Sequence, residues 1–321
     1  MPQYLDPKND LTFKRVFGEH KHLCMSLLNS MLPLEKPIVS IEYQSGEMIP
    51  ELAEVLRQTI VDVRCTDEAG RQFIVEMQMY WTESFKSRVL LNASKAYVMQ
   101  LDKAKEFQLL QPVYALSFVN EIFEKSPEME NEYYHYYKIV NINNTEKQIE
   151  GLEFLFVELP KFKPHNRAEK KLHELWLRFL TEVNETTEEI PQELLDNELT
   201  CEAVDYMKTA AYTKGQLETY YKWKIDIMTE RSAYIDATKK GMMEGIMEGR
   251  KIGMKEGMKE GMKEGMKEGM KEGMKEGMKE GIKEGIIITA LNMLRDGMSA
   301  EDVCKYTGLS KQQIDKLHID L

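Results

Sequence analysis

Residues 60–79, IVDVRCTDEAGRQFIVEMQM, decide the fold of this chain. Apolar and polar residues alternate on both arms of this stretch, as they do in half-buried β-strands. Residues 67–70, DEAG, separate the two arms and are rich in turn-forming types. The pattern predicts a β-hairpin in which Thr66 pairs with Gln72.

Two acidic side chains meet on this predicted hairpin. In the same register Asp62 lies opposite Glu76, and directly opposed Cβ atoms in a sheet are ~5 Å apart. Side chains two residues apart on a strand share a face, so Gln78 points the same way as Glu76. Two carboxylates held that close repel each other and favour a bound divalent cation, for which magnesium is the natural candidate. Spacing alone leaves open the alternative of a solvent-facing hairpin whose acids only increase solubility.

The apolar residues indicate which face carries the acids. We expect Val61, Val63 and Cys65 to form one face of the first strand. The acids then share the opposite, half-apolar face with Ile60 and Ile74. A carboxylate pair on such a face costs stability unless a partner compensates for its burial.

The residues around the hairpin carry a family resemblance. Residues 10–18, DLTFKRVFG, are similar to the D-x-x-F-K-x-x-F opening helix of one nuclease family. The acidic hairpin and a following helix supply further residues in the matching order, namely Asp62, Glu76, Gln78, Arg88 and Tyr97. The chain thus resembles the PD-(D/E)XK nucleases. Within them it resembles the Rpn branch of recombination-promoting nucleases and PD-(D/E)XK nuclease family transposases.

The resemblance implies an α/β fold with an αβββαβ core and extra strands. It also implies that Asp62 and Glu76 bind Mg²⁺, or Mn²⁺ in its place, for phosphodiester hydrolysis. Gln78 occupies the position of the superfamily lysine. A glutamine can position a water molecule but brings no charge, so the metal must contribute more to activating that water.

Cations on two helices are candidate DNA contacts. By this resemblance Arg88 on the helix after the hairpin meets phosphate oxygens, and Lys95 and Lys14 are further candidates. For any one of the three, a solvated helix face is the alternative. Glu51 and Glu54 could supply a further carboxylate.

Composition limits the class of protein. The chain has 321 residues and a formal net charge of −11, which predicts modest, salt-sensitive DNA affinity. Its four cysteines are far apart and form neither a zinc-binding spacing nor a compact disulfide framework. We find no signal peptide and no apolar run long enough to span a bilayer, so we expect a cytoplasmic protein without a membrane partner.

Four parts follow one another along the chain. They are a nuclease-like domain over residues 1–165, a helical region over 166–240, a repeat over 241–285 and a small helical unit over 286–321. We expect helices at residues 11–31, 83–105, 168–183, 194–212 and 216–240. We expect further strands at residues 38–43, 112–119, 133–140 and 152–159.

The repeat consists of four-residue units, seven of them Met-Lys-Glu-Gly without variation. Met, Lys and Glu favour helix, while each Gly costs ~1 kcal/mol relative to Ala. A step of four residues advances ~400° around a helix, so the Met and Gly rows wind around its axis. We favour a helix, or coiled-coil linker, that is stable when paired in a homo-oligomer. The alternative is a marginal helix that acts as a spacer.

The C-terminal unit resembles a helix-turn-helix. Ser299 begins one helix with a capping-box pattern, Gly308 lies in a tight turn, and Ser310 caps a last helix. A packing or dimerisation cap is the alternative to a DNA-reading role, because the exposed face of the last helix offers no arginine.

Together these features predict a magnesium-dependent DNA endonuclease, linked to recombination or transposition by resemblance only. The first alternative is a catalytically weak or decayed nuclease fold that acts as a DNA-binding or oligomerising module. A weaker alternative is an RNA nuclease or defence toxin, since the same metal chemistry acts on either polymer.

Overall fold

The computed structural model describes residues 3–48, 59–101, 106–164 and 171–319. The chain divides into two compact units, Met1–Tyr234 and Ile235–Leu321. The first unit contains the sheet and the candidate active site, and the second contains the whole repeat and the C-terminal helices.

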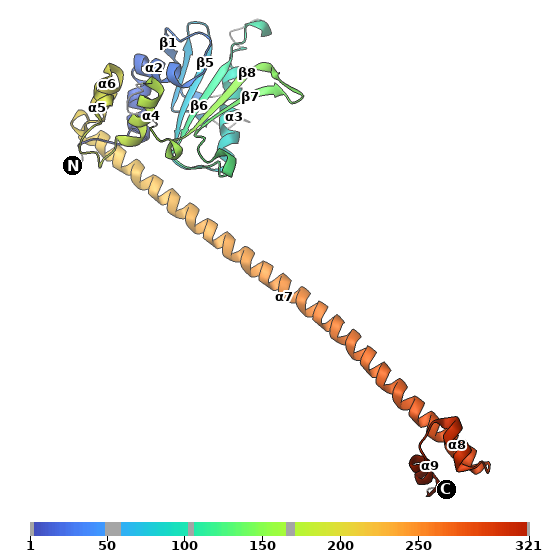
Figure 1. Cartoon of the computed structure of the whole chain (residues 1–321). Helices are drawn as coiled ribbons and strands as arrows, with labels where there is room; N and C mark the ends of the chain where they lie inside the picture. The colour runs from blue at the N-terminus through green and yellow to red at the C-terminus, as the bar shows by residue number, and fades with distance from the viewer. Residues whose placement is uncertain (1–2, 49–58, 102–105, 165–170, 320–321) are drawn as a thin grey trace. The chain divides into compact units, whose positions relative to one another are not determined.

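A six-stranded mixed sheet forms the centre of the first unit, in the order β1-β4-β5-β6-β8-β7 (Figure 1). Its strands are β1 (Ile41–Tyr43), β4 (Val63–Asp67), β5 (Gln72–Gln78), β6 (Val113–Val119), β7 (Tyr134–Asn141) and β8 (Asn144–Glu158). The pairs β5–β6 and β6–β8 are parallel, and the other pairs are antiparallel. A separate two-stranded sheet, which the sequence did not suggest, pairs β2 (Glu47–Met48) with β3 (Thr59–Ile60).

Helices cover both faces of the sheet. Helix α3 (Glu83–Val98) packs against β5, β6 and β8 on one face. On the other face lie α1 (Asp10–Phe13), a π-helical turn (Lys14–Gly18), α2 (Lys21–Met31) and α4 (Leu172–Glu182). The helices α5 (Gln192–Leu195) and α6 (Glu198–Met207) pack against α4. The observed mixed α/β fold is consistent with the predicted αβββαβ core.

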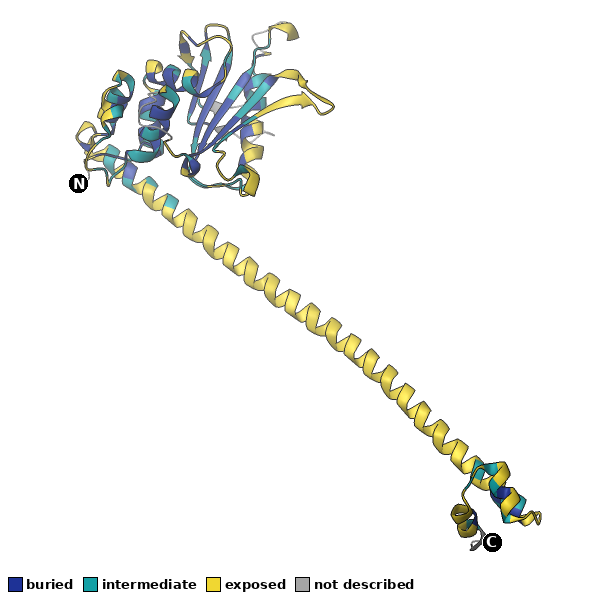
Figure 2. Ribbon diagram, in the orientation of Figure 1, coloured by how far each residue is buried: buried dark blue, intermediate teal, exposed yellow. Residues whose placement is uncertain are grey.

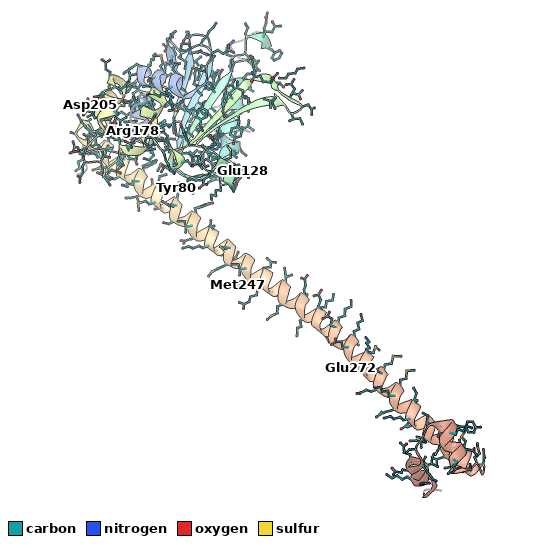
Figure 3. The ribbon with its side chains drawn as sticks, in the orientation of Figure 1. Tyr80, Glu128, Arg178, Asp205, Met247 and Glu272 are labelled. Carbon is teal, nitrogen blue, oxygen red and sulfur yellow. The ribbon has the colours of Figure 1, made fainter. Side chains whose placement is uncertain are left out.

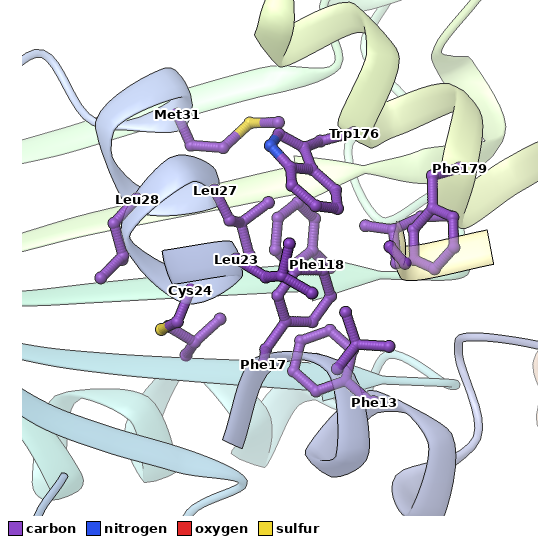
Figure 4. Packing of buried hydrophobic residues seen from close by; sticks show 14 of the residues in the cluster. Phe13, Phe17, Leu23, Cys24, Leu27, Leu28, Met31, Phe118, Trp176 and Phe179 are labelled. Carbon is purple, nitrogen blue, oxygen red and sulfur yellow. The ribbon is translucent and has the colours of Figure 1, made fainter. Parts of the chain in front are cut away.

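Aromatic side chains fill the core between the sheet and α2 and α4 (Figure 4). The ring centroids of Phe17 and Trp176 are 5.4 Å apart, and those of Phe13 and Phe118 are 6.4 Å apart. All four side chains are fully buried. A smaller core on the opposite face, which includes Ile74 and Phe85, holds α3 against the sheet. That core fixes α3 beside β5, where the candidate site lies.

The β4–β5 hairpin has the predicted register. Thr66 pairs with Gln72, and Val63 pairs with Val75 at the other end of the ladder. Gly70 takes a φ of 84° in the turn, a backbone conformation that L residues with a Cβ rarely adopt. The alternation of the sequence was therefore sufficient to align the two strands.

One prediction about this hairpin was wrong. Val61 does not share a face with Val63 and Cys65. It packs with Ile74 in the α3-facing core instead. The chain bends at Asp62, so the two-residue alternation of a strand does not extend back to Val61.

Several elements differ from their predicted bounds. The helix expected at residues 11–31 is interrupted between Gly18 and Lys21, and the helix expected at 83–105 ends at Val98. Strand β8 begins at Asn144 rather than at residue 152. Its first residues are polar and exposed, so they lacked the apolar pattern that marks a buried strand (Figure 2).

Helix α7 (Lys214–Arg295) includes the whole repeat. Near its start the Tyr220 side chain is buried, and its hydroxyl donates a 2.6 Å hydrogen bond to Glu185 Oε1. In contrast, the repeat side chains are exposed, as Figure 2 shows by colour and Figure 3 shows for Met247 and Glu272. The repeat is helical, as expected, and its pairing with another copy stays a prediction.

Two short helices, α8 (Ala300–Thr307) and α9 (Lys311–Ile319), follow α7. Ser299 caps α8 by accepting a hydrogen bond from the backbone N–H of Asp302, and Gly308 ends it with a φ of 75°. Val303 and Ile314 pack against the end of α7 in a small core. Across the described ranges, no helix combines the length and apolar character needed to cross a membrane.

Candidate active site

Asp62 lies at the bend that leads into β4. Its Oδ2 accepts a 2.8 Å hydrogen bond from the backbone N–H of Met77 on β5, and its side chain is 22% exposed. The pKa of Asp62 is raised to about 7, first by burial and then by the negative charges of Asp10 and Glu76. The Met77 hydrogen bond and the charge of Lys14 oppose this rise. Burial therefore outweighs the charge of Lys14 and favours the protonated form of Asp62.

Glu76 lies on β5 and is buried. Its Oε1 accepts a 2.9 Å hydrogen bond from Asn92 Nδ2 on α3. Burial raises the pKa of Glu76, and the Asn92 hydrogen bond and the charge of Arg88 partly offset this rise. Ser117 on β6 pairs with Glu76 in the parallel ladder. Because Asp62 is bonded to the residue that follows Glu76, and the charge of Glu76 raises the pKa of Asp62, the two acids lie at the same end of the hairpin.

The oxygen atoms around these two acids fit a hard cation. Each carboxylate has one oxygen held by the protein, while Asp62 Oδ1 and Glu76 Oε2 accept no hydrogen bond within the described part of the chain. Asn92 Oδ1 and Ser117 Oγ are also buried there and have no hydrogen-bond partner among the residues that the structure describes. Hard cations such as Mg²⁺ prefer oxygen ligands of these types.

The protein supplies few charged ligands at this site. Among the residues that the structure describes, no three His, Cys, Asp or Glu side chains are grouped to hold a metal ion. Mg²⁺ is usually held by one or two carboxylates together with water and substrate phosphates. Asp62 and Glu76 satisfy that minimum. Glu51 and Glu54, the other candidate carboxylates, lie outside the described residues.

Gln78 is hydrogen-bonded at both ends of its amide. Its Oε1 accepts a 2.6 Å hydrogen bond from Arg88 Nη2, and its Nε2 donates a 2.7 Å hydrogen bond to the Tyr80 carbonyl oxygen. The Arg88 guanidinium also lies 4.9 Å from the centroid of the Phe85 ring and remains exposed. Gln78 therefore orients an exposed cation beside the two acids.

Lys14 also lies beside the acids. Its Nζ is 2.7 Å from Asp10 Oδ1 and 3.9 Å from Asp62 Oδ1. Lys95 is half-buried and follows Asn92 by three residues on α3, so the two residues lie on neighbouring parts of one helix face. The structure thus places Lys14 directly at the site and Lys95 farther along α3.

Three residues of the site were not assigned a role from the sequence. Asn92 could have been found, because it follows Arg88 by four residues and therefore shares its helix face. Ser117 gave no signal, because its position beside Glu76 depends on a parallel pairing between distant segments. Asp10 was part of the quoted N-terminal pattern, but its electrostatic effect on Asp62 depends on how the first helix packs.

Comparison with known proteins gives one family. A family model described as PD-(D/E)XK nuclease family transposase matches residues 7–234. This range contains every residue of the candidate site. Neither the curated proteins nor the solved structures contain a match to this chain.

Proposed function

Because the chain belongs to the PD-(D/E)XK nuclease family transposases, we propose that it is a Mg²⁺-dependent DNA endonuclease. Asp62 and Glu76 bind the metal in this proposal. The observation that best supports this proposal is the arrangement of the carboxylate oxygens of Asp62 and Glu76. Met77 N–H fixes Asp62 Oδ2 and Asn92 Nδ2 fixes Glu76 Oε1, so one oxygen of each acid remains available. When bound, the metal would polarise the scissile phosphate and lower the pKa of a bound water.

The chain's own cations act on the phosphate in this proposal. Arg88, held by Gln78, donates to a phosphate oxygen next to the scissile bond. Gln78 is neutral, and Lys14 supplies a positive charge near Asp62 in its place. Lys95 contacts a phosphate farther along the strand. Gln78 therefore acts as a positioning residue for Arg88, in addition to hydrogen-bonding the attacking water.

Plasmid cleavage at low salt tests this proposal. The wild type is compared with Asp62→Ala and Glu76→Gln, and the matched control Glu128→Ala removes an exposed acid far from the site in sequence. We expect the wild type and the control to cut with Mg²⁺ or Mn²⁺ and to stop in EDTA. Both site variants should lose at least ~100-fold in rate.

Two results would contradict the proposal. Equal cutting by Asp62→Ala, with its circular dichroism unchanged, would place the activity elsewhere or in a contaminant. Absence of both cutting and Mg²⁺ binding in the wild type would favour the non-catalytic alternative. A labelled RNA in the same reaction separates a DNA nuclease from an RNA nuclease.

One observation favours a second candidate function. Gln78 carries no charge, and both ends of its amide are already bonded to the protein. A decayed nuclease fold that binds DNA or oligomerises without cutting it would have no need for a charged group at this position. Measurement of DNA affinity in EDTA, beside the cleavage assay, separates the two functions.

We also propose that the protein is a cytoplasmic homo-oligomer that associates through the repeat in α7. The exposed Met row of that helix supports association, and four free cysteines support a reducing compartment. Sedimentation velocity over a range of concentrations tests the association. A single monomeric species at all concentrations would favour the spacer alternative.

A further inference from the structure

Arg64 on β4 is a buried cation without an acidic partner. Its side chain is 7% exposed, and among the described residues no carboxylate forms an ion pair with it. Its Nη2 donates a 2.9 Å hydrogen bond to Gln72 Oε1, and its Nη1 lies 4.0 Å from the Met99 sulfur. Its Nε is buried and has no hydrogen-bond partner in the described ranges. A guanidinium has five N–H donors, so most of its hydrogen-bonding capacity is unused.

An unpaired buried charge is costly for a fold to keep. Burial lowers the pKa of Arg64, although an arginine side chain stays protonated in proteins. An apolar residue of similar volume would fill the same position at lower cost. A ligand for the charge therefore explains a buried arginine at this position better than packing does.

Arg64 lines a pocket of about 490 Å³. Pockets for small ligands commonly measure roughly 300–1,000 Å³. Four of the side chains around Arg64 are neutral amides, namely Gln44, Gln72, Gln100 and Gln111, and the remaining lining includes the apolar side chains of Met99 and Leu109. No acidic side chain is found in the part of the wall that the structure describes. The lining therefore combines one positive charge with neutral polar and apolar groups.

The hydrogen bonds in the wall leave donors available to a ligand. The Gln100 amide is used at both ends, because it donates to the Gln111 carbonyl oxygen and accepts from the Gln111 N–H, each at 2.9 Å. This double contact holds one wall of the pocket. Gln72 uses only its oxygen, for Arg64, and its amide nitrogen has no partner among the described residues. A surplus of donors beside a guanidinium suits an anion with several acceptor oxygens.

The pocket and the candidate metal site share one face of the sheet. Arg64 follows Asp62 by two residues, and it pairs with Ile74, which precedes Glu76 by two residues. Two residues of strand span ~6.6 Å. A ligand in the pocket would therefore lie on the α3-facing side of β4 and β5, displaced along the strands from the two acids.

We propose that this pocket binds the phosphate group of a nucleotide through Arg64 and the Gln72 amide. A guanidinium matches phosphate oxygens with two parallel hydrogen bonds, and the neutral amides can meet the polar edge of a nucleoside. The nucleotide is either free or part of a nucleic-acid strand. Binding of a nucleotide within a strand rests on the proposed nuclease function, and binding of a free nucleotide does not.

Calorimetric titration in EDTA tests the pocket without metal. The probes are inorganic phosphate, deoxyadenosine monophosphate and a short single-stranded oligonucleotide. The proteins are the full-length wild type, Arg64→Met, and the control Lys125→Met, which removes an exposed cation that does not line the pocket. We expect the wild type and the control to bind, and Arg64→Met to bind at least ~10-fold more weakly.

The probes separate the two sources. Binding of the mononucleotide but not of the oligonucleotide identifies a free nucleotide, and stronger binding of the oligonucleotide identifies a strand. If the wild type binds none of the probes, or Arg64→Met binds them as well as the wild type does, the proposal is overturned. Binding should persist in Asp62→Ala, so loss of cleavage and loss of phosphate binding remain separate results.

The melting temperature of the variants gives a further test. Arg64→Met should melt at or above the wild-type temperature, because it removes an unpaired buried charge. A large fall in melting temperature would make Arg64 a structural residue and contradict the proposal. Thr66→Phe fills the pocket while keeping Arg64, and it should weaken binding of the same probes.

Discussion

Arg88 on α3 donates a 2.6 Å hydrogen bond to Gln78 Oε1 at the end of β5. The other end of the Gln78 amide is fixed by the Tyr80 carbonyl oxygen, so the amide cannot turn without losing a bond. This contact connects the strand that carries Glu76 to an exposed cation on the covering helix. It holds the charged guanidinium of Arg88 beside the neutral amide of Gln78 at this end of β5.

Replacement of Arg88 should weaken DNA binding in a salt-dependent way. Arg88→Ala removes one cation, so the slope of log K against log salt should fall by about 1. Gln78→Ala removes no charge and should leave that slope unchanged. Fluorescence anisotropy in EDTA at several salt concentrations measures both. An unchanged slope in Arg88→Ala would show that this arginine does not contact phosphate.

Replacement of Asp62 should change how stability depends on pH. In the metal-free protein the pKa of Asp62 is about 7, above its ordinary value of 3.8. The folded protein therefore holds this proton more tightly than the unfolded chain does. The resulting stability is fully present below pH ~4 and is lost as pH rises through ~7.

Asp62→Asn cannot ionise and should escape this loss. Relative to the wild type it should gain stability between pH 4 and 7, by up to ~4 kcal/mol above pH 7. Chemical denaturation in EDTA at several pH values measures the difference. Addition of Mg²⁺ at pH 8 should then stabilise the wild type and not the variant. A constant difference at all pH values would argue against a raised pKa at Asp62.

The aromatic core should be sensitive to truncation. Phe17 is fully buried against Phe13 and Trp176, so Phe17→Ala should cost about 3–5 kcal/mol of unfolding free energy. The control Phe107→Ala makes the same chemical change at a side chain that is 79% exposed, and should cost less than about 0.5 kcal/mol. Urea denaturation compares the two. Similar costs would contradict the packing seen in Figure 4.

Glycine replacement in the repeat distinguishes its two candidate roles. A Cβ added at Gly265 or Gly269 meets no atom within 4 Å, so alanine fits at either position in the single chain. Each change should favour the helix by ~1 kcal/mol and raise the circular dichroism signal at high temperature. If glycines permit close approach between copies, the double variant should associate more weakly in sedimentation. Unchanged association would favour the spacer role.

Local pattern was enough to predict the centre of the fold. The alternation over β4 and β5 and the turn at Gly70 indicated the pairing of Thr66 with Gln72. Side-chain direction in a strand follows from position alone, which puts Glu76 and Gln78 on one side of β5, whereas Asp62 lies at the bend before β4 and meets β5 through the Met77 N–H. The bend at Asp62 was not predicted, and it is the reason that Val61 was assigned to the wrong face.

Other parts of the site depend on long-range packing. Ser117 reaches Glu76 through a parallel ladder, and Asp10 affects Asp62 through the packing of the first helix. Arg64 gave no sequence signal, because one arginine in an alternating strand normally points into solvent. Its burial follows from the cover provided by Met99 and the glutamines around it, which come from separate segments.

The Met-Lys-Glu-Gly units at residues 254–281 give α7 a screw symmetry, in which each four-residue step combines a rise along the axis with a rotation about it. Their side chains are exposed, so a shift by four residues reproduces every local environment. Gain or loss of a unit changes the helix length by ~6 Å and removes no core contact. The number of units can therefore change without loss of a contact in the core of the sheet domain or in the small C-terminal core.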